Sequence, residues 1–167
     1  MTRIGILSDT HSTIHPGLFD FFKDCDEIWH AGDIGNIQTA DTLSAFKPLR
    51  AVFGNIDGQD VRICYPKVQL FITEQVKVLM THIGGYPGRY EPEIRKLLEK
   101  EKPQLFISGH SHILKVMYDK KYGLLHINPG AAGKSGLHKF ITFARFIING
   151  NEIKDLEIFE GQRQEKR

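Results

Sequence analysis

Residues 105–112 read LFISGHSH, an apolar run followed by a glycine and by two histidines that flank one serine. The apolar run has the length and composition of a short buried strand. Polar side chains that follow a strand of an open α/β sheet lie at its carboxyl edge, where such sheets bind ligands. If other strands of this chain end in the same way, that edge holds a ligand site.

The first third of the chain alternates between strand and helix patterns. Apolar and β-branched runs mark the strands, and helical spacing of apolar residues marks the helices, with proline at the start of the first and after the end of the second. The predicted order is strand 3–8, helix 16–24, strand 27–30, helix 36–46 and strand 49–53. This alternation is typical of an α/β fold with parallel strands and helices packed against them.

The rest of the chain is predicted to be mostly strands. Runs at 68–73 and 76–81 flank Glu74-Gln75, which indicates a hairpin. A loop rich in glycine and proline, a helix at 91–102 and the strand at 105–108 follow. Antiparallel strands are expected at 116–118, 124–127, 140–148 and 153–159, with Asn149-Gly150 as the last turn. Residues 1–160 form one expected domain, and residues 161–167 are expected to be a disordered tail.

Composition limits the classes of protein that fit. A chain of 167 residues with 41% hydrophobic and 25% charged residues is typical of one soluble globular domain. A net charge of +2 without a basic stripe argues against nucleic acid as a partner. No signal peptide pattern and no apolar run of about 20 residues is found, so no membrane contact is expected. Cys25 and Cys64 match no CxxC spacing and favour a cytoplasmic, reducing location. None of these features decides whether the chain forms a homo-oligomer.

Five predicted strands end in side chains that can bind a metal ion. Glycine stands directly before three of these positions, which suits backbone crowding around a small centre. The set combines carboxylate, amide and imidazole groups without a thiolate, which suits Mn, Fe, Zn, Ni or Co. Seven ligands are more than one ion ordinarily binds, and they fit two divalent ions that share a carboxylate. The residues are Asp9, His11, Asp33, Asn55, His82, His110 and His112.

Each of these motifs also has an ordinary structural explanation. The Asp9–His11 pair can cap a helix, and Gly32-Asp33 can form a plain turn. A single histidine is more often hydrogen-bonded in a core or at a surface than bound to metal. Joint occurrence at five strand ends favours the metal site over these separate explanations. Outside the set we expect a packed His30, a structural His126 and a solvated His138.

Taken in order, the blocks Asp9-x-His11, Gly32-Asp33, Gly54-Asn55, His82 and Gly109-His110-Ser111-His112 resemble those of the calcineurin-like metallophosphoesterases. The segments HAGDI at 30–34 and INPGA at 127–131 are similar to those of small single-domain YfcE-type phosphodiesterases. The resemblance runs from residue 3 to about residue 159. It implies a four-layer α-β-β-α sandwich with two mixed sheets and a dinuclear metal centre.

The resemblance also implies a role for each ligand. The first ion would be bound by Asp9, His11 and His112, and the second by Asn55, His82 and His110, with Asp33 as the bridge. In an extended GHSH segment, alternate side chains point to the same side. Both histidines of that segment then face one centre, and each serves a different ion.

Asp33 and Asn55 are the predicted catalytic residues. The carboxylate offsets the charge of both ions, and the amide can donate its hydrogens to phosphate. Many members of the superfamily carry a histidine after this asparagine, which protonates the leaving group, but this chain has Ile56. Further candidates for substrate contacts are His15, Asp57 and Arg89.

The expected function is hydrolysis of a small phosphoester, and specifically of a phosphodiester. Two ions about 3.5–4 Å apart can bridge a water and lower its pKa, and the bridging hydroxide then attacks phosphorus in line. One alternative is a phosphomonoesterase with the same centre. Another is a non-catalytic scaffold like the retromer subunit of this fold, although the complete ligand set favours an enzyme. The weak net charge disfavours a nuclease.

Overall fold

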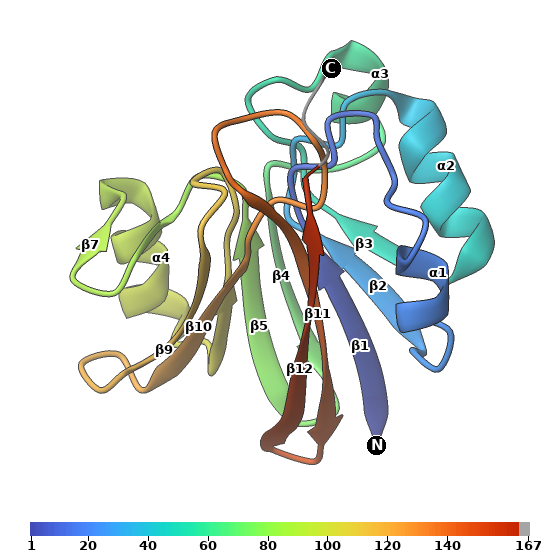
Figure 1. Cartoon of the computed structure of the whole chain (residues 1–167). Coiled ribbons are helices and arrows are strands. Elements are labelled where there is room, and N and C mark those ends of the chain that lie inside the picture. Colours follow the sequence, from blue (N-terminus) through green and yellow to red (C-terminus); the bar gives the residue numbers. More distant parts are fainter. Residues whose placement is uncertain (164–167) are drawn as a thin grey trace.

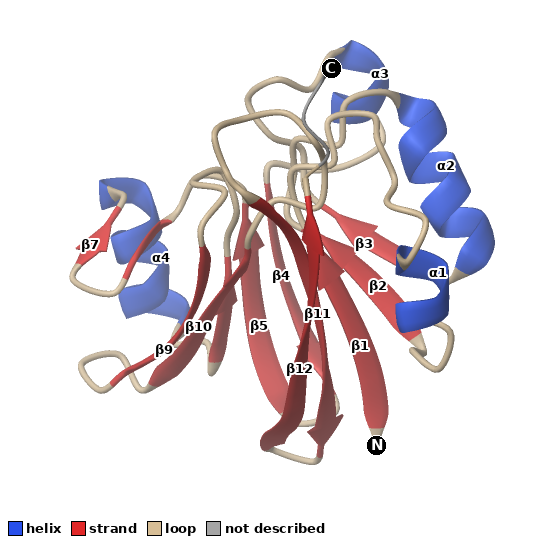
Figure 2. Ribbon diagram, viewed as in Figure 1, coloured by secondary structure: helices blue, strands red, loops and turns tan. Residues whose placement is uncertain are grey.

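The computed structural model describes residues 1–163 as two five-stranded sheets packed face to face, with helices on the outer faces (Figure 1, Figure 2). The first sheet has the order β12 (Glu152–Gln162), β11 (Phe140–Asn149), β1 (Thr2–Leu7), β2 (Glu27–His30) and β3 (Leu49–Ala51). The second has the order β4 (Val68–Thr73), β5 (Val76–Thr81), β8 (Leu105–Ile107), β10 (Leu124–Pro129) and β9 (Leu114–Asp119). The layers are α-β-β-α, as the resemblance implies.

Both sheets are mixed. Strands β1, β2 and β3 are parallel, as the alternating pattern predicts, and β11 runs antiparallel to β1. In the second sheet β5, β8 and β10 are parallel, while β4 and β9 are antiparallel edge strands. The strand predicted at 124–127 as antiparallel is antiparallel to β9, but the prediction is wrong for its other neighbour, because β10 is parallel to β8. Parallel strands bring their carboxyl ends to one edge of each sheet.

The main core lies between the two sheets. Alternate side chains of the strands point into it, including the buried Ile6, Trp29, Val78, Ile107 and Phe146. Burying an aliphatic or aromatic side chain of this size contributes about 1.5–3 kcal/mol each. The edge of both sheets is consequently a rigid platform for the loops that follow the strands.

The helices differ from the predictions mainly in length. Helix α2 (Ile37–Phe46) starts at Asn36, whose side chain accepts the N–H of Thr39 at 2.9 Å, and covers β2 and β3. Helix α4 (Pro92–Glu101) packs on the second sheet and ends at Lys102, which adopts the left-handed conformation. Helix α1 is only Leu18–Phe21, because the chain after it forms tight turns instead of continuing to 24.

Three short elements are absent from the predictions. Helix α3 (Gln59–Arg62) has one turn, which is too short to produce a period in the sequence. Strands β6 (Gly85–Tyr86) and β7 (Arg89–Tyr90) form a small hairpin inside the segment expected to be a loop. This hairpin lies beside α4 on the outer side of the second sheet (Figure 1).

The carboxyl-terminal strand is longer than predicted. β12 reaches Gln162, which pairs with Phe140, and the N–H of Arg163 donates to the carbonyl of Lys139. The first residues of the expected tail at 161–167 therefore belong to the sheet, and residues 164–167 lie outside the described part of the chain. Cys25 and Cys64 are both free thiols. No helix within residues 1–163 combines the length and the apolarity that crossing a membrane requires.

Candidate metal centre

The loops that follow the strands of both sheets meet at the upper end of the sandwich (Figure 1). The N–H of Asp9 donates to the carbonyl of Gly32 at 2.9 Å, which joins the loops after β1 and β2. The N–H of Gly109 donates to the carbonyl of His82 at 3.0 Å, which joins the loops after β8 and β5. The N–H of His110 donates to Asp9 Oδ2 at 3.1 Å, which joins the loops of the two sheets.

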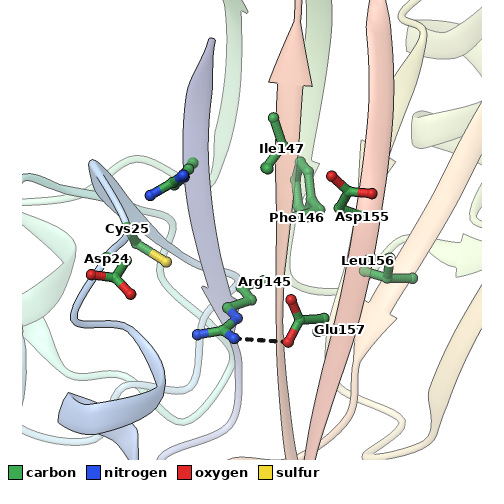
Figure 3. Close-up of a pocket in the computed structure, with 9 residues that line it drawn as sticks. Asp24, Cys25, Arg145, Phe146, Ile147, Asp155, Leu156 and Glu157 are labelled. Carbon is green, nitrogen blue, oxygen red and sulfur yellow. Dashed lines mark hydrogen bonds and ion pairs between the residues drawn. The ribbon is translucent and has the colours of Figure 1, made fainter.

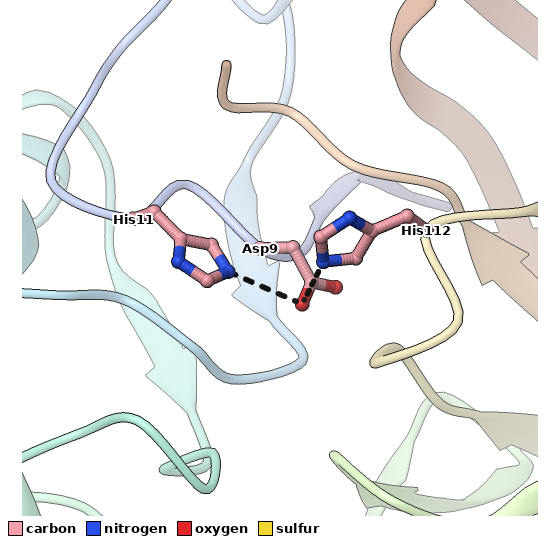
Figure 4. Close-up of side chains that lie close together, drawn as sticks. All are labelled: Asp9, His11 and His112. Atoms are coloured by element: carbon pink, nitrogen blue, oxygen red, sulfur yellow. Dashed lines mark ion pairs between the residues drawn. The ribbon is translucent and has the colours of Figure 1, made fainter. Parts of the chain in front are cut away.

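Asp9, His11 and His112 form the first cluster of potential ligands (Figure 4). The Nε2 atoms of His11 and His112 lie 3.8 and 3.2 Å from the same Asp9 oxygen, Oδ1. Asp9 is fully buried, while both imidazoles are partly exposed. The three side chains come from two different sheets and point at one another.

Asp33, His82 and His110 form the second cluster. The Nε2 atom of His82 lies 3.2 Å from Asp33 Oδ2, and both of these side chains are buried. The Oδ2 atom of Asp33 is also 3.4 Å from His11 Nε2 in the first cluster. One carboxylate oxygen therefore lies within 3.4 Å of one nitrogen of each cluster.

The atoms that face the centre lack protein partners. Among the described residues, Asp9 Oδ1, His11 Nε2 and His82 Nε2 are buried without a hydrogen bond. A buried polar atom without a partner costs about 1–3 kcal/mol. Two ligands that are each about 2.0–2.1 Å from one zinc ion lie roughly 3.0–3.4 Å from each other. The nitrogen and oxygen spacings around Asp33 fit this pattern, so the residues fit two divalent ions.

Neighbouring groups orient the ligand atoms. Asp9 Oδ2 accepts the hydroxyl of Ser8 at 2.6 Å and the N–H of His110 at 3.1 Å, which leaves Oδ1 for the centre. His82 Nδ1 lies 2.7 Å from the carbonyl of Ala31 and donates its proton there, which leaves the Nε2 lone pair free. Such outer hydrogen bonds set the tautomer of a metal-binding histidine.

The charges within the clusters perturb their titration. The Asp9 carboxylate raises the pKa of His11. Burial opposes a charge on His82, but the Asp33 carboxylate outweighs it and raises the pKa of His82 as well. Burial also opposes ionisation of Asp9, yet His11 and His112 hold the pKa of Asp9 well below its usual range. Protons and metal ions therefore compete for these imidazoles.

The backbone at the site is strained. Asp9, His11, Asp33, His110 and His112 all have positive φ angles between 46° and 71°. Such angles are uncommon outside glycine and cluster at functional sites. The GHSH segment is therefore not extended, and that prediction is wrong: it is a tight turn. Its two histidines still enter different clusters, because each left-handed residue redirects its side chain.

Two glycines permit this crowding. A Cβ atom at Gly54 would overlap the Asp33 carboxylate, and one at Gly109 would overlap the Ser8 hydroxyl. The backbone after β3 and the backbone after β8 can approach the ligands only because Gly54 and Gly109 lack side chains. This agrees with the crowding inferred from the glycines of the sequence.

A family model for the calcineurin-like phosphoesterase superfamily domain matches residues 2–151. The chain belongs to this superfamily. A probable metallophosphoesterase of Methanothermobacter thermautotrophicus is 32% identical over 135 residues, which cover 77% of this chain and 76% of that protein. Metal-dependent phosphoesterase chemistry is thus the activity that family membership supports.

Solved structures share the fold of this superfamily member. Vps29 from Chaetomium thermophilum has a TM-score of 0.78 at 17% identity and covers 98% of this chain and 89% of its own. A protein described as a novel archaeal phosphodiesterase has a TM-score of 0.70 at 20% identity and covers 94% of this chain and 99% of its own. At these identities the likeness concerns the fold alone.

The loop after β3 brings Asn55 to the edge of the second cluster. Asn55 and His82 line one cavity of about 250 Å³. The next residue, Ile56, donates its N–H to Asp33 Oδ1 at 3.1 Å, and its side chain is 47% exposed. Arg62 holds this loop by donating to the carbonyls of Asp57 and Asn55 at 2.6 and 3.3 Å.

Asp57 and His30 hydrogen-bond to the loops that carry the candidate metal ligands. The buried Asp57 carboxylate accepts the N–H groups of Ile34, Gly35 and Gly54 at 2.8–3.1 Å, so it joins the loops after β2 and β3. This geometry favours the positioning role for Asp57 over a substrate contact. His30 is fully buried, and burial lowers its pKa to about 3, so its neutral ring bridges Thr10 and Gly32. It is packed near the site, as predicted.

His15 and Arg89 occupy different environments. The His15 ring packs 5.0 Å from Phe159, and its Nδ1 accepts the N–H of Gly17 at 3.0 Å. These contacts give His15 a structural explanation, and none of its contacts within residues 1–163 joins it to the clusters. Arg89 instead lines a cavity that also includes His110.

His138 is a site neighbour that sequence analysis misses. Its ring lies edge-on to His112 with centroids 5.1 Å apart, and its Nε2 donates to the carbonyl of Gly133 at 2.8 Å. His138 is therefore only partly exposed, and the expectation that it is solvated holds only in part. Nothing in the segment GLHKF signals this role, because the loop folds back on His112 only in the tertiary structure.

A cavity of about 420 Å³ lies away from the clusters, over β1, β11 and β12 (Figure 3). Arg145 and Glu157 form an ion pair of 2.7 Å in its wall. Burial raises the pKa of the Cys25 thiol in this cavity to about 11, so the thiol is protonated near neutral pH. Its described lining residues supply neither a set of metal ligands nor an ionised nucleophile.

Proposed function

We propose that this protein is a metal-dependent phosphodiesterase with a dinuclear centre. The ligands of one ion in this proposal are Asp9, His11 and His112, those of the other are Asn55, His82 and His110, and Asp33 serves both. The observation that carries the proposal is the Asp33 oxygen within 3.4 Å of a nitrogen from each cluster. Oxygen and imidazole donors suit Mn, Fe, Zn, Ni or Co.

The ions, when bound, lower the pKa of water and neutralise charge on phosphoryl oxygens. The chain contributes the two buried carboxylates of Asp9 and Asp33, which offset the charge of the ions. The hydrogen bond from His82 to Ala31 holds that imidazole in one orientation throughout turnover. The Asn55 amide is available to donate to a non-bridging phosphate oxygen.

Two cavities that each include a residue of the second cluster support a diester as the substrate. One cavity of about 250 Å³ contains Asn55 and His82. Another, of about 460 Å³, contains His110 and Arg89. A diester has two arms on phosphorus, and these cavities can receive one each, whereas a monoester needs only one. The fold-level similarity to an archaeal phosphodiesterase agrees with this proposal.

The leaving group receives no proton from the residue after Asn55. Ile56 has no acidic hydrogen, and the Arg62 guanidinium beside it donates to two backbone carbonyls. Esters whose leaving oxygen tolerates negative charge should therefore react fastest, because general acid assistance is typically worth about 10²–10⁴-fold.

The test compares bis(p-nitrophenyl) phosphate with p-nitrophenyl phosphate on the purified chain loaded with Mn, Ni, Co or Zn. We expect a higher kcat/KM for the diester and loss of turnover in His82→Ala. A higher kcat/KM for the monoester would establish the phosphomonoesterase alternative. Two bound ions without turnover on either ester would favour the scaffold alternative.

A further inference from the structure

The cavity beside His110 lies between the β6–β7 hairpin and the outer face of the second sheet. Its volume is about 460 Å³. Tyr90 anchors the hairpin by donating its hydroxyl to Asp119 at 2.6 Å, and Ser108 donates to the carbonyl of Gly85 at 3.3 Å. The cavity therefore has a fixed wall, and it opens directly next to a residue of the candidate metal centre.

His126 lines this cavity and is only 1% exposed. Its ring stacks on Phe106 with centroids 5.1 Å apart, and neither ring nitrogen has a hydrogen-bond partner among the described residues. Burial lowers the pKa of His126 to about 4, so near neutral pH the ring offers one N–H donor and one lone pair. The expected structural histidine is thus packed on one face and leaves two buried polar atoms without a protein partner among the described residues.

The walls of the cavity carry more positive than negative charge. The Lys115 ammonium lies 4.0 Å from the centroid of the Tyr86 ring. Arg89 lines the same wall. No carboxylate within residues 1–163 lies within ion-pair distance of either cation. The acidic lining residue is Glu91, which directly precedes helix α4, where the helix dipole favours a carboxylate.

We propose that this cavity binds a carboxylate group on the far end of one arm of the diester. Lys115 and Arg89 supply the positive charge, and the neutral His126 donates a hydrogen bond at the floor. The inference rests on the proposed function, since it assumes that phosphorus is held at the metal centre. It narrows the substrate class to diesters with a charged arm.

The probes are ω-carboxyalkylphosphonates with three to six carbons, each compared with the methyl-ended phosphonate of equal length. Calorimetric titration of the zinc-loaded chain measures their affinities. We expect one chain length at which the carboxylate improves the affinity by about tenfold, as hydrogen bonds to charged groups typically do. The ring ¹⁵N shifts of His126 should move with that probe and not with its methyl-ended partner.

Three variants distinguish the loss of a ligand contact in the cavity from a loss of the folded structure. Lys115→Met keeps the stem over Tyr86 and should abolish most of the preference for the carboxylate. His126→Phe keeps the stack on Phe106 and should reduce the preference as well. The matched control is Lys120→Met, a charge removal at an exposed turn, which should retain the preference. Thermal unfolding of each variant verifies that it is folded.

The two proposals fail in different ways. Turnover of simple diesters without any gain from a carboxylate at any length would overturn the charged-arm inference and leave the phosphodiesterase proposal intact. Stronger binding of an uncharged aromatic arm would also overturn it in favour of stacking on Tyr86. Absence of both turnover and phosphonate binding in the zinc-loaded chain would overturn both proposals.

Discussion

Asp33→Asn is the most direct perturbation of the candidate centre. The amide keeps the size of the side chain and an acceptor for the N–H of Ile56, which lies 3.1 Å from Oδ1. The other oxygen, Oδ2, is replaced by an amide group that faces His82 and His11. The substitution removes a negative charge whose oxygen, Oδ2, lies 3.2 Å from Nε2 of His82 and 3.4 Å from Nε2 of His11.

The expected loss follows from that geometry. A unit charge at about 3.3 Å interacts with another by roughly 5 kcal/mol at an effective dielectric constant of 20, before relaxation. Part of this is recovered by rearrangement, and removal of a major electrostatic group typically costs about 100-fold or more in turnover. We therefore expect kcat to fall by at least about 100-fold and the metal content to fall at both clusters. The pKa of His82 in the metal-free protein should also fall, because Asp33 raises it.

The assay combines elemental analysis of the metal-reconstituted protein with turnover of bis(p-nitrophenyl) phosphate. NMR titration of the metal-free protein follows His82. Asp60→Asn is the control, since Asp60 is an exposed carboxylate that accepts the N–H of Ile37 and is not a member of either cluster. An Asp33→Asn variant that retains two ions and near-normal turnover would refute the shared-ligand reasoning.

Other predictions test the two clusters, the leaving group and the protons. His112→Ala should empty mainly the first cluster and His82→Ala mainly the second, measured as metal per chain; equal metal content in both variants and the parent would contradict the ligand assignment. Ile56→His should flatten the dependence of kcat on phenol pKa across substituted phenyl diesters. Because Ile56 is 47% exposed, the protein's free energy of unfolding should change by less than about 0.5 kcal/mol in this variant. The pKa values of His11 and His82 are raised above 6.5 in the folded, metal-free protein. Protonation of these histidines therefore stabilises the metal-free fold below pH 6.5, and this stabilisation is lost as the pH rises through the raised pKa values. Thermal unfolding in EDTA should therefore show a midpoint that falls as the pH rises above 6.5, whereas metal affinity measured by competition should rise over the same range; a flat midpoint would contradict the raised pKa values.

Local sequence was sufficient for the strands and for the chemistry at their ends. The run at 105–108 and its counterparts predict strands because side-chain periodicity reports burial directly. Once those strands are taken as parallel, their carboxyl ends must lie at a common edge. The donors of Asp9 and Asp33, which follow two such strands, could therefore be assigned to one site without coordinates.

The family resemblance implied how the donors are divided, but only the tertiary structure decided the backbone geometry that divides them and which other residues reach them. His110 and His112 enter separate clusters through positive φ angles of 71° and 61°, which the surrounding fold imposes against the intrinsic preference of the residue. His138 contacts His112 because its loop folds back on the site, and His126 of β10 faces a cavity with Arg89 because the β6–β7 hairpin packs beside the second sheet. These contacts depend on distances between chain segments far apart in sequence, and no local pattern of residues encodes such distances.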